Sequence, residues 1–178
     1  MRLRALTALA AIAVAGSAAV AANAYSAVFP PVTGQNLNGR TFHLPGDFQA
    51  PASFVYIAFV RGQQAQVDSW KSAIADARRR FPAIGEYEVP TLSKSNALFR
   101  GFIDGGMRSG IRDDATRNVT ITLYIDKRPF DASLGIGSED EIAVLLVKPD
   151  GTVLWRASGA YAPAKRAGLD EALAAVAG

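Results

Sequence analysis

The chain has 178 residues, with 19 Lys and Arg against 16 Asp and Glu for a formal net charge of +3, and it contains no cysteine. This length accommodates one domain with a sizeable core and is too short for two ordinary domains. The small net charge lacks the strong positive field of a nucleic-acid-binding protein, and without cysteine the chain forms no disulfide and performs no thiol–disulfide exchange, whose nucleophile is a thiolate.

The first 24 residues have the pattern of a secretory signal peptide. Arg2 and Arg4 precede an apolar run over residues 5–20, and Ala22-Asn23-Ala24 offers a small-x-small cleavage site. We therefore expect export, cleavage after residue 24 and a periplasmic location; in a eukaryote the same segment would indicate a mitochondrial location. A retained membrane anchor is the alternative, although the run is short for a membrane span.

Residues 25–40 predict an irregular N-terminal segment with a turn at Asn38-Gly39, and residues 41–178 predict one folded domain that opens with a short strand over 41–44. The almost wholly apolar run 53–60 is typical of a central strand that is buried on both faces. Residues 63–81 then have the apolar spacing of an amphipathic helix, with Pro82 behind them. The apolar positions of that helix are Val67, Trp70, Ile74, Ala77 and Phe81.

Further along, residues 87–92 predict a second strand parallel to the first. A helix with Leu98, Phe99 and Phe102 follows, and glycines break it at 105, 106 and 110. The alternating segment 119–125 predicts a half-buried strand. Two strand-length runs, 142–147 and 152–156, flank Asp150-Gly151 and predict a β-hairpin, and a closing helix follows Pro163.

This order of elements is similar to that of the thioredoxin-like superfamily. It predicts a three-layer α/β sandwich, with a central mixed sheet, helices on both faces and one extra strand before the C-terminal hairpin. In redox members of that superfamily a Cys-x-x-Cys pair opens the first helix, and a cis-proline precedes the hairpin. Here the first stretch reads Arg61-Gly62-Gln63-Gln64-Ala65-Gln66 and the second Ser138-Glu139-Asp140-Glu141-Ile142, so both parts of the thiol site are replaced.

A more specific resemblance rests on short motifs in a fixed order over residues 52–175. Among them are Asp68-Ser69-Trp70, Tyr87-Glu88-Val89-Pro90, Phe99-Arg100-Gly101-Phe102-Ile103 and Trp155-Arg156-Ala157-Ser158-Gly159. With these motifs the chain resembles the assembly factors of mitochondrial ATP synthase and their bacterial relatives. The resemblance implies a non-redox, non-enzymatic module that binds a protein partner, such as a subunit of a membrane complex, and helps that complex assemble. It implies no cofactor, no nucleic acid and at most peripheral membrane contact.

Two segments supply candidate binding residues. Amides at the start of the first helix, where redox members carry thiols, can bind backbone groups of a client; solvated glutamines are the alternative. The segment 100–117 combines arginines with methionine and isoleucine, residue types that favour interfaces, in a glycine-broken loop; a solvated loop with weak local ion pairs is the alternative. The candidate partner-binding residues are Gln63, Gln66, Met107, Arg108, Ile111 and Arg112.

Two other functions stay open. A cysteine-independent enzyme would use carboxylates and arginines among Asp104, Arg108, Asp113 and Asp126, and a degenerate peroxiredoxin-like protein would serve as a structural subunit. No metal site is expected, because the single histidine, His43, cannot supply the ligand set of a transition metal.

Overall fold

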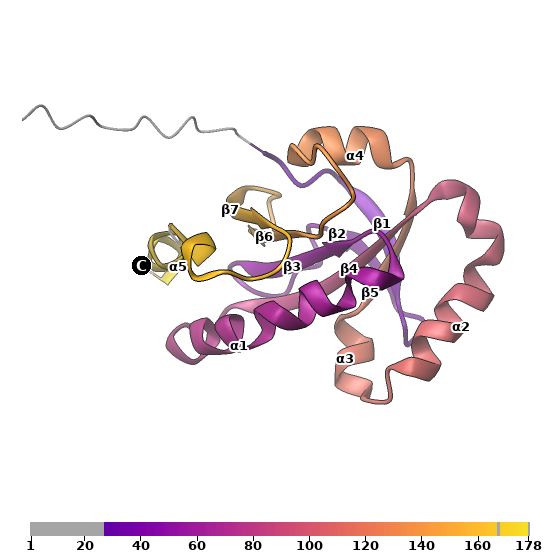
Figure 1. The fold of residues 1–178 in the computed structure, drawn as a ribbon, viewed down its shortest axis with the longest axis horizontal. Coiled ribbons are helices and arrows are strands. Elements are labelled where there is room, and N and C mark those ends of the chain that lie inside the picture. Colours follow the sequence, from indigo (N-terminus) through magenta and orange to yellow (C-terminus); the bar gives the residue numbers. More distant parts are fainter. Residues whose placement is uncertain (1–26, 167, 178) are drawn as a thin grey trace, which may run out of the picture.

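The computed structural model describes residues 27–166 and 168–177, and a seven-stranded mixed sheet runs through them (Figure 1). The strands are β1 (Val32–Asn36), β2 (Thr41–Leu44), β3 (Ser53–Ala58), β4 (Gly85–Ser93), β5 (Ile121–Ile125), β6 (Ala143–Val147) and β7 (Val153–Ser158). Their order across the sheet is β2-β1-β5-β4-β3-β6-β7. The parallel strands β5, β4 and β3 form its centre, and antiparallel strands flank them on both sides. The expected signal peptide, residues 1–24, lies outside the described residues.

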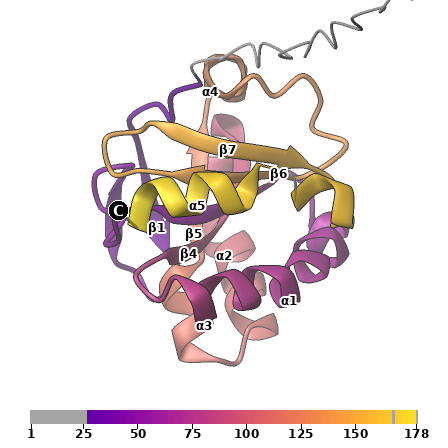
Figure 2. The ribbon, with the colours of Figure 1, turned by 90° about the vertical axis from the view of Figure 1, so that its left-hand side faces the viewer.

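Helices cover both faces of this sheet (Figures 1 and 2). The α-helices are α1 (Gln64–Arg80), α2 (Arg100–Gly110), α3 (Asp114–Val119), α4 (Lys127–Leu134) and α5 (Leu169–Ala177), and short 3-10 helices lie at η1 (Arg61–Gln63), η2 (Lys94–Phe99) and η3 (Pro163–Arg166). One core packs under α4, and a second packs under α1 and α5. None of the helices described has the length and apolar character needed to cross a bilayer.

The strand β3 lies at the centre of the sheet, and its side chains pack into both cores. Val55 and Ile57 belong to the core on the α4 side, whereas Phe54 and Tyr56 belong to the core on the α1 side, and all four are fully buried. Successive strand residues point to opposite faces, so a strand covered by helices on both faces lacks a polar alternation. The expected central strand is confirmed.

Trp70 anchors α1 on the sheet, as the helical spacing predicts. Its side chain is fully buried, and its ring meets Trp155 and Tyr161 edge-on, at centroid distances of 5.7 and 5.1 Å. The indole Nε1 donates a hydrogen bond to the carbonyl oxygen of Gly159 at 2.8 Å. A single residue therefore links α1 to the hairpin and to the segment that follows it.

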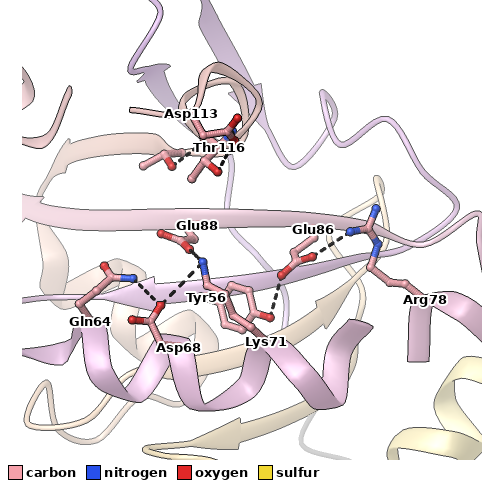
Figure 3. A network of polar contacts seen from close by, with 10 residues as sticks. Tyr56, Gln64, Asp68, Lys71, Arg78, Glu86, Glu88, Asp113 and Thr116 are labelled. Carbon is pink, nitrogen blue, oxygen red and sulfur yellow. Dashed lines mark hydrogen bonds and ion pairs between the residues drawn. The ribbon is translucent and has the colours of Figure 1, made fainter. Parts of the chain in front are cut away.

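A polar network also ties α1 to β4 (Figure 3). Lys71 Nζ lies 2.7 Å from Glu88 Oε1, and Arg78 Nη1 lies 2.9 Å from Glu86 Oε2. The phenol of Tyr56 donates to Glu86 Oε1 at 3.0 Å. Burial, followed by the charge and the hydrogen bond of Glu86, raises the pKa of Tyr56 above its ordinary value. The phenol stays protonated, and the network positions the helix.

The expectation of an irregular segment over residues 25–40 is wrong for the part that forms β1. This strand pairs antiparallel with both β2 and β5, so the folded domain begins before residue 41. A Cβ at Gly34 would lie 2.7 Å from the side chains of Ile121 and Leu123, so glycine permits the close approach of β1 to β5. The strand forms through these pairings and has no apolar pattern of its own that would predict it.

Candidate binding surface

At the start of α1, two glutamines link the helix to the loop before β6. The side chain of Gln63 is only 3% exposed, and its Oε1 accepts hydrogen bonds from the backbone N–H groups of Phe59 at 2.7 Å and Val60 at 3.3 Å. Its Nε2 donates to the carbonyl oxygen of Glu139 at 2.7 Å. The half-buried Gln66 accepts from the backbone N–H of Ile142 at 3.1 Å.

The candidate client-binding amide of Gln63 is therefore buried and bonded within the protein, and the solvated alternative is wrong for it. A buried amide needs hydrogen-bond partners, and here the protein's own backbone supplies them. Gln63 occupies the space beside the loop 138–142 and holds this loop against the start of α1. Its role in the structure is therefore internal, and Gln66 shares it through its contact with Ile142.

Charged residues lie next to this internal link. Lys127 pairs with Glu139, and its ammonium lies 5.7 Å from the centroid of the Phe59 ring. Burial, and then the hydrogen bond and charge of Glu139, raise the pKa of Asp131 to about 6, against the opposing effect of Lys127. Among the described residues no group of three or more His, Cys, Asp or Glu is placed to hold a metal ion.

The helix α2 is attached to the edge of the domain by a few polar contacts. Tyr124 donates to Asp104 Oδ1 at 2.7 Å, and the guanidinium of Arg100 lies 4.7 Å from the centroid of the Tyr124 ring. Arg108 Nε donates to the carbonyl oxygen of Leu37 at 2.7 Å. Burial, and then the hydrogen bond that Tyr124 donates to Asp104, raise the pKa of Tyr124. Arg108, a candidate partner-binding residue, therefore anchors α2 to the segment after β1.

The other candidate partner-binding residues of this segment differ in how far their side chains are exposed. Met107 on α2 and Ile111, directly after α2, are half-buried, and Arg112 is exposed. The structure thus brings Met107, Arg108, Ile111 and Arg112 together along one helix and its C-terminal end, and it places Gln63 and Gln66 at the start of α1 instead.

The most exposed apolar surface among the described residues lies on a segment that was not among the candidate binding residues. Leu98 is 90% exposed, Phe99 64% and Phe102 86%. We call these three residues the apolar ridge; they lie on η2 and α2, on the side of the molecule opposite to α5 (Figure 1). The sequence placed these residues on a helix, and the structure shows that their side chains are exposed. The signal in the sequence was the cluster of glycines in the same helix, which is unusual for a helix in a packed core.

No family model matches the chain, and no curated protein matches it. Among solved structures it is similar to BsSco, a member of the Sco family of cytochrome c oxidase assembly proteins, with a TM-score of 0.54 and 14% identity over 85% of this chain and 92% of that chain. The chain has a thioredoxin-like fold. It is also similar to a putative thiol:disulfide interchange protein DsbE from Chlorobium tepidum, with a TM-score of 0.51 and 13% identity over 86% of this chain and 97% of that one. It is similar as well to a putative electron transfer protein from Aquifex aeolicus VF5, with a TM-score of 0.57 and 10% identity over 85% of this chain and 97% of that chain.

In this thioredoxin-like domain the residues of the enzyme hypothesis have structural partners. Asp104 accepts from Tyr124, Asp113 caps α3 by accepting from Thr116, and Asp126 caps α4. The hydrogen bonds from Thr116 lower the pKa of Asp113. Within the described part of the chain, no hydrogen bond or ion pair joins any two side chains of the set Asp104, Arg108, Asp113 and Asp126.

A pocket of about 390 Å³ lies on the thioredoxin-like domain between the loop after α4 and the hairpin. Glu141 and Arg156 are its charged lining residues, and Arg156 Nη1 already donates to the carbonyl oxygen of Leu134 at 2.9 Å. The apolar ridge, with its exposed side chains, remains the stronger candidate for recognition.

Proposed function

We propose that this protein is a non-redox, non-enzymatic thioredoxin-like module that acts after export and assists the assembly of a membrane complex, with ATP synthase as the first candidate. The non-redox part of the proposal rests on the absence of cysteine from the sequence. The internal hydrogen bonds of Gln63 support it further. Redox proteins of this fold carry a thiol at the start of the first helix, whereas Gln63 at that place bonds to the protein's own backbone.

The observation that carries the binding role is the apolar ridge. Three large apolar side chains stand next to one another with 64–90% of their surface exposed. Single exposed apolar residues are common, but a cluster of this kind rimmed by polar residues marks an interaction site. Two of the ridge residues, Phe99 and Phe102, belong to the Phe99–Ile103 motif that contributes to the resemblance with the ATP synthase assembly factors.

Two further points support a role in assembly outside the cytoplasm. One similar structure, BsSco, belongs to a family of cytochrome c oxidase assembly proteins. The N-terminal segment of the present sequence has the features of an export signal. Fold similarity alone does not fix function, so the proposal depends on the ridge and is tested there.

The test is complementation in a host strain from which the gene has been deleted. We expect native gels of solubilised membranes to show less assembled ATP synthase in the deletion strain, and the wild-type gene to restore it. A Leu98→Ser, Phe102→Ser variant should fail to restore it, whereas Val60→Ser, which changes a residue 60% exposed at another surface, should succeed. Unchanged levels of every membrane complex in the deletion strain would contradict the proposal.

A second assay addresses the chemistry. The purified protein should show no turnover above buffer in insulin reduction, because it has no thiol to donate.

A further inference from the structure

We propose that the partner docks as an α-helix along η2 and α2, with an apolar face against the ridge and acidic residues on its flank. This inference rests on the proposed function, since it names the class of partner that the same surface takes. It follows from three features of the segment 94–112: the direction of its apolar side chains, its glycines and its charge.

The first feature is the division of α2 into two faces. Ile103, Asp104 and Met107 are half-buried toward the domain, and Asp104 is held there by the phenol of Tyr124. Phe102 lies on the outward face of α2 and is 86% exposed, and Leu98, on the 3-10 helix η2 just before α2, is 90% exposed. The two exposed side chains, close to one another in the chain, offer an apolar contact surface at the start of α2. An amphipathic or apolar helix is a common occupant of such a surface.

The second feature is that the protein's own fold does not explain the glycines of α2. A Cβ at Gly101, Gly105, Gly106 or Gly110 would meet no atom within 4 Å, and none of these glycines has a positive φ. Each one nevertheless costs up to about 1 kcal/mol of helix stability relative to alanine. Gly101 and Gly105, like Gly106 and Gly110, are four residues apart. Pairs of this spacing allow the backbone of a second helix to approach closely.

The third feature is charge. Lys94, Arg100, Arg108 and Arg112 stand against one acid, Asp104, in the segment 94–112. Arg100 lies over the Tyr124 ring and Arg108 donates to the carbonyl oxygen of Leu37, whereas Lys94 and Arg112 are exposed at the two ends of the segment. The net positive charge of the segment complements a partner with acidic residues. Two copies of this protein would bring two cationic surfaces together, which disfavours a homodimer. An anionic lipid surface is the competing occupant, because exposed Phe and Leu beside basic residues also suit such a surface, and the vesicle experiment below tests it.

The variant Gly105→Leu separates these occupants. Its new side chain points into open space, so it should leave the thermal midpoint unchanged or raise it, since leucine is the better helix former. The same side chain should block a second helix from approaching the α2 backbone. Gly62→Leu is the matched control, because a Cβ at Gly62 also meets no atom within 4 Å but lies at η1.

Three probes are used with the full chain. The first is a synthetic amphipathic helix with a Leu/Ala face and glutamates on both flanks, together with the same peptide carrying lysine for every glutamate. The second is a set of phosphatidylglycerol vesicles. The third is the membrane complex that wild-type protein retains on affinity purification. Sedimentation of the protein alone measures self-association.

We expect the glutamate peptide to bind the wild type and Gly62→Leu, to bind Gly105→Leu about tenfold or more weakly, and to be favoured over the lysine peptide. No binding of the glutamate peptide, or equal binding by Gly105→Leu, overturns the inference. So does tighter binding of Gly105→Leu to vesicles, or a wild-type dimer that Gly105→Leu dissociates. If the wild type and Gly105→Leu retain the membrane complex equally, the inference fails while the proposed function stands. If the peptide result holds but no complex is retained, the helix-binding face stands and the proposed function fails.

Discussion

Replacing Gln63 by alanine tests whether this buried glutamine holds the start of α1 against the loop before β6. The change removes three hydrogen bonds, with the backbone N–H groups of Phe59 and Val60 and with the carbonyl oxygen of Glu139. Phe59 is buried and Glu139 half-buried, so water replaces the lost partners incompletely. A buried polar group left without a partner costs about 1–3 kcal/mol. We therefore expect Gln63→Ala to lower the free energy of unfolding by about 2–4 kcal/mol.

For a protein of this size that loss corresponds to a fall in the thermal midpoint of about 4–16 °C. Circular dichroism during heating, together with urea denaturation, measures both quantities. The matched control is Gln64→Ala, because Gln64 is exposed and its side chain donates to the exposed Asp68 in the same helix. That control should change stability by less than about 0.5 kcal/mol. Equal midpoints for the two variants would refute the structural role of Gln63.

The other predictions concern stability and pH. Trp70→Ala should lower the free energy of unfolding, measured by urea denaturation, by about 3–5 kcal/mol because the side chain is fully buried. A loss near zero would contradict its central place in the core. Arg108→Glu should lower the free energy of unfolding by about 1–2 kcal/mol because the guanidinium donates to the carbonyl oxygen of Leu37. Arg112→Glu should lower it by less than about 0.5 kcal/mol. Equal losses for the two variants would show that Arg108 does not anchor α2. The carboxyl of Asp131 has a pKa raised from 3.8 to about 6, so the folded state binds more protons between these values and loses stability as the pH rises through them. Urea denaturation at several pH values should therefore find Asp131→Asn more stable than the wild type by about 1 kcal/mol at pH 7, a figure reduced for solvent screening. Below about pH 4 the variant should gain no stability. A gain that persists at low pH would refute this titration of Asp131.

The sequence by itself predicts the elements whose pattern is local. The apolar run of β3, the spacing of Trp70 and its neighbours in α1, and the Asp150-Gly151 turn between β6 and β7 all appear in the structure as expected. Each pattern reflects backbone geometry within a few residues, or the burial of one face of one element. The absence of thiol chemistry is also a property of the sequence, because it depends on composition alone.

Tertiary structure decided where several of these residues lie. β1 is a strand because Gly34 lets it pair closely with β5, which is distant in the sequence. Gln63 is buried because the loop at Glu139 folds over it. Leu98 and Phe102 are exposed because no other element covers the outward face of η2 and α2 among the described residues. An apolar pattern shows that one face of a helix avoids water, but whether the protein or a partner covers that face depends on the packing of distant segments.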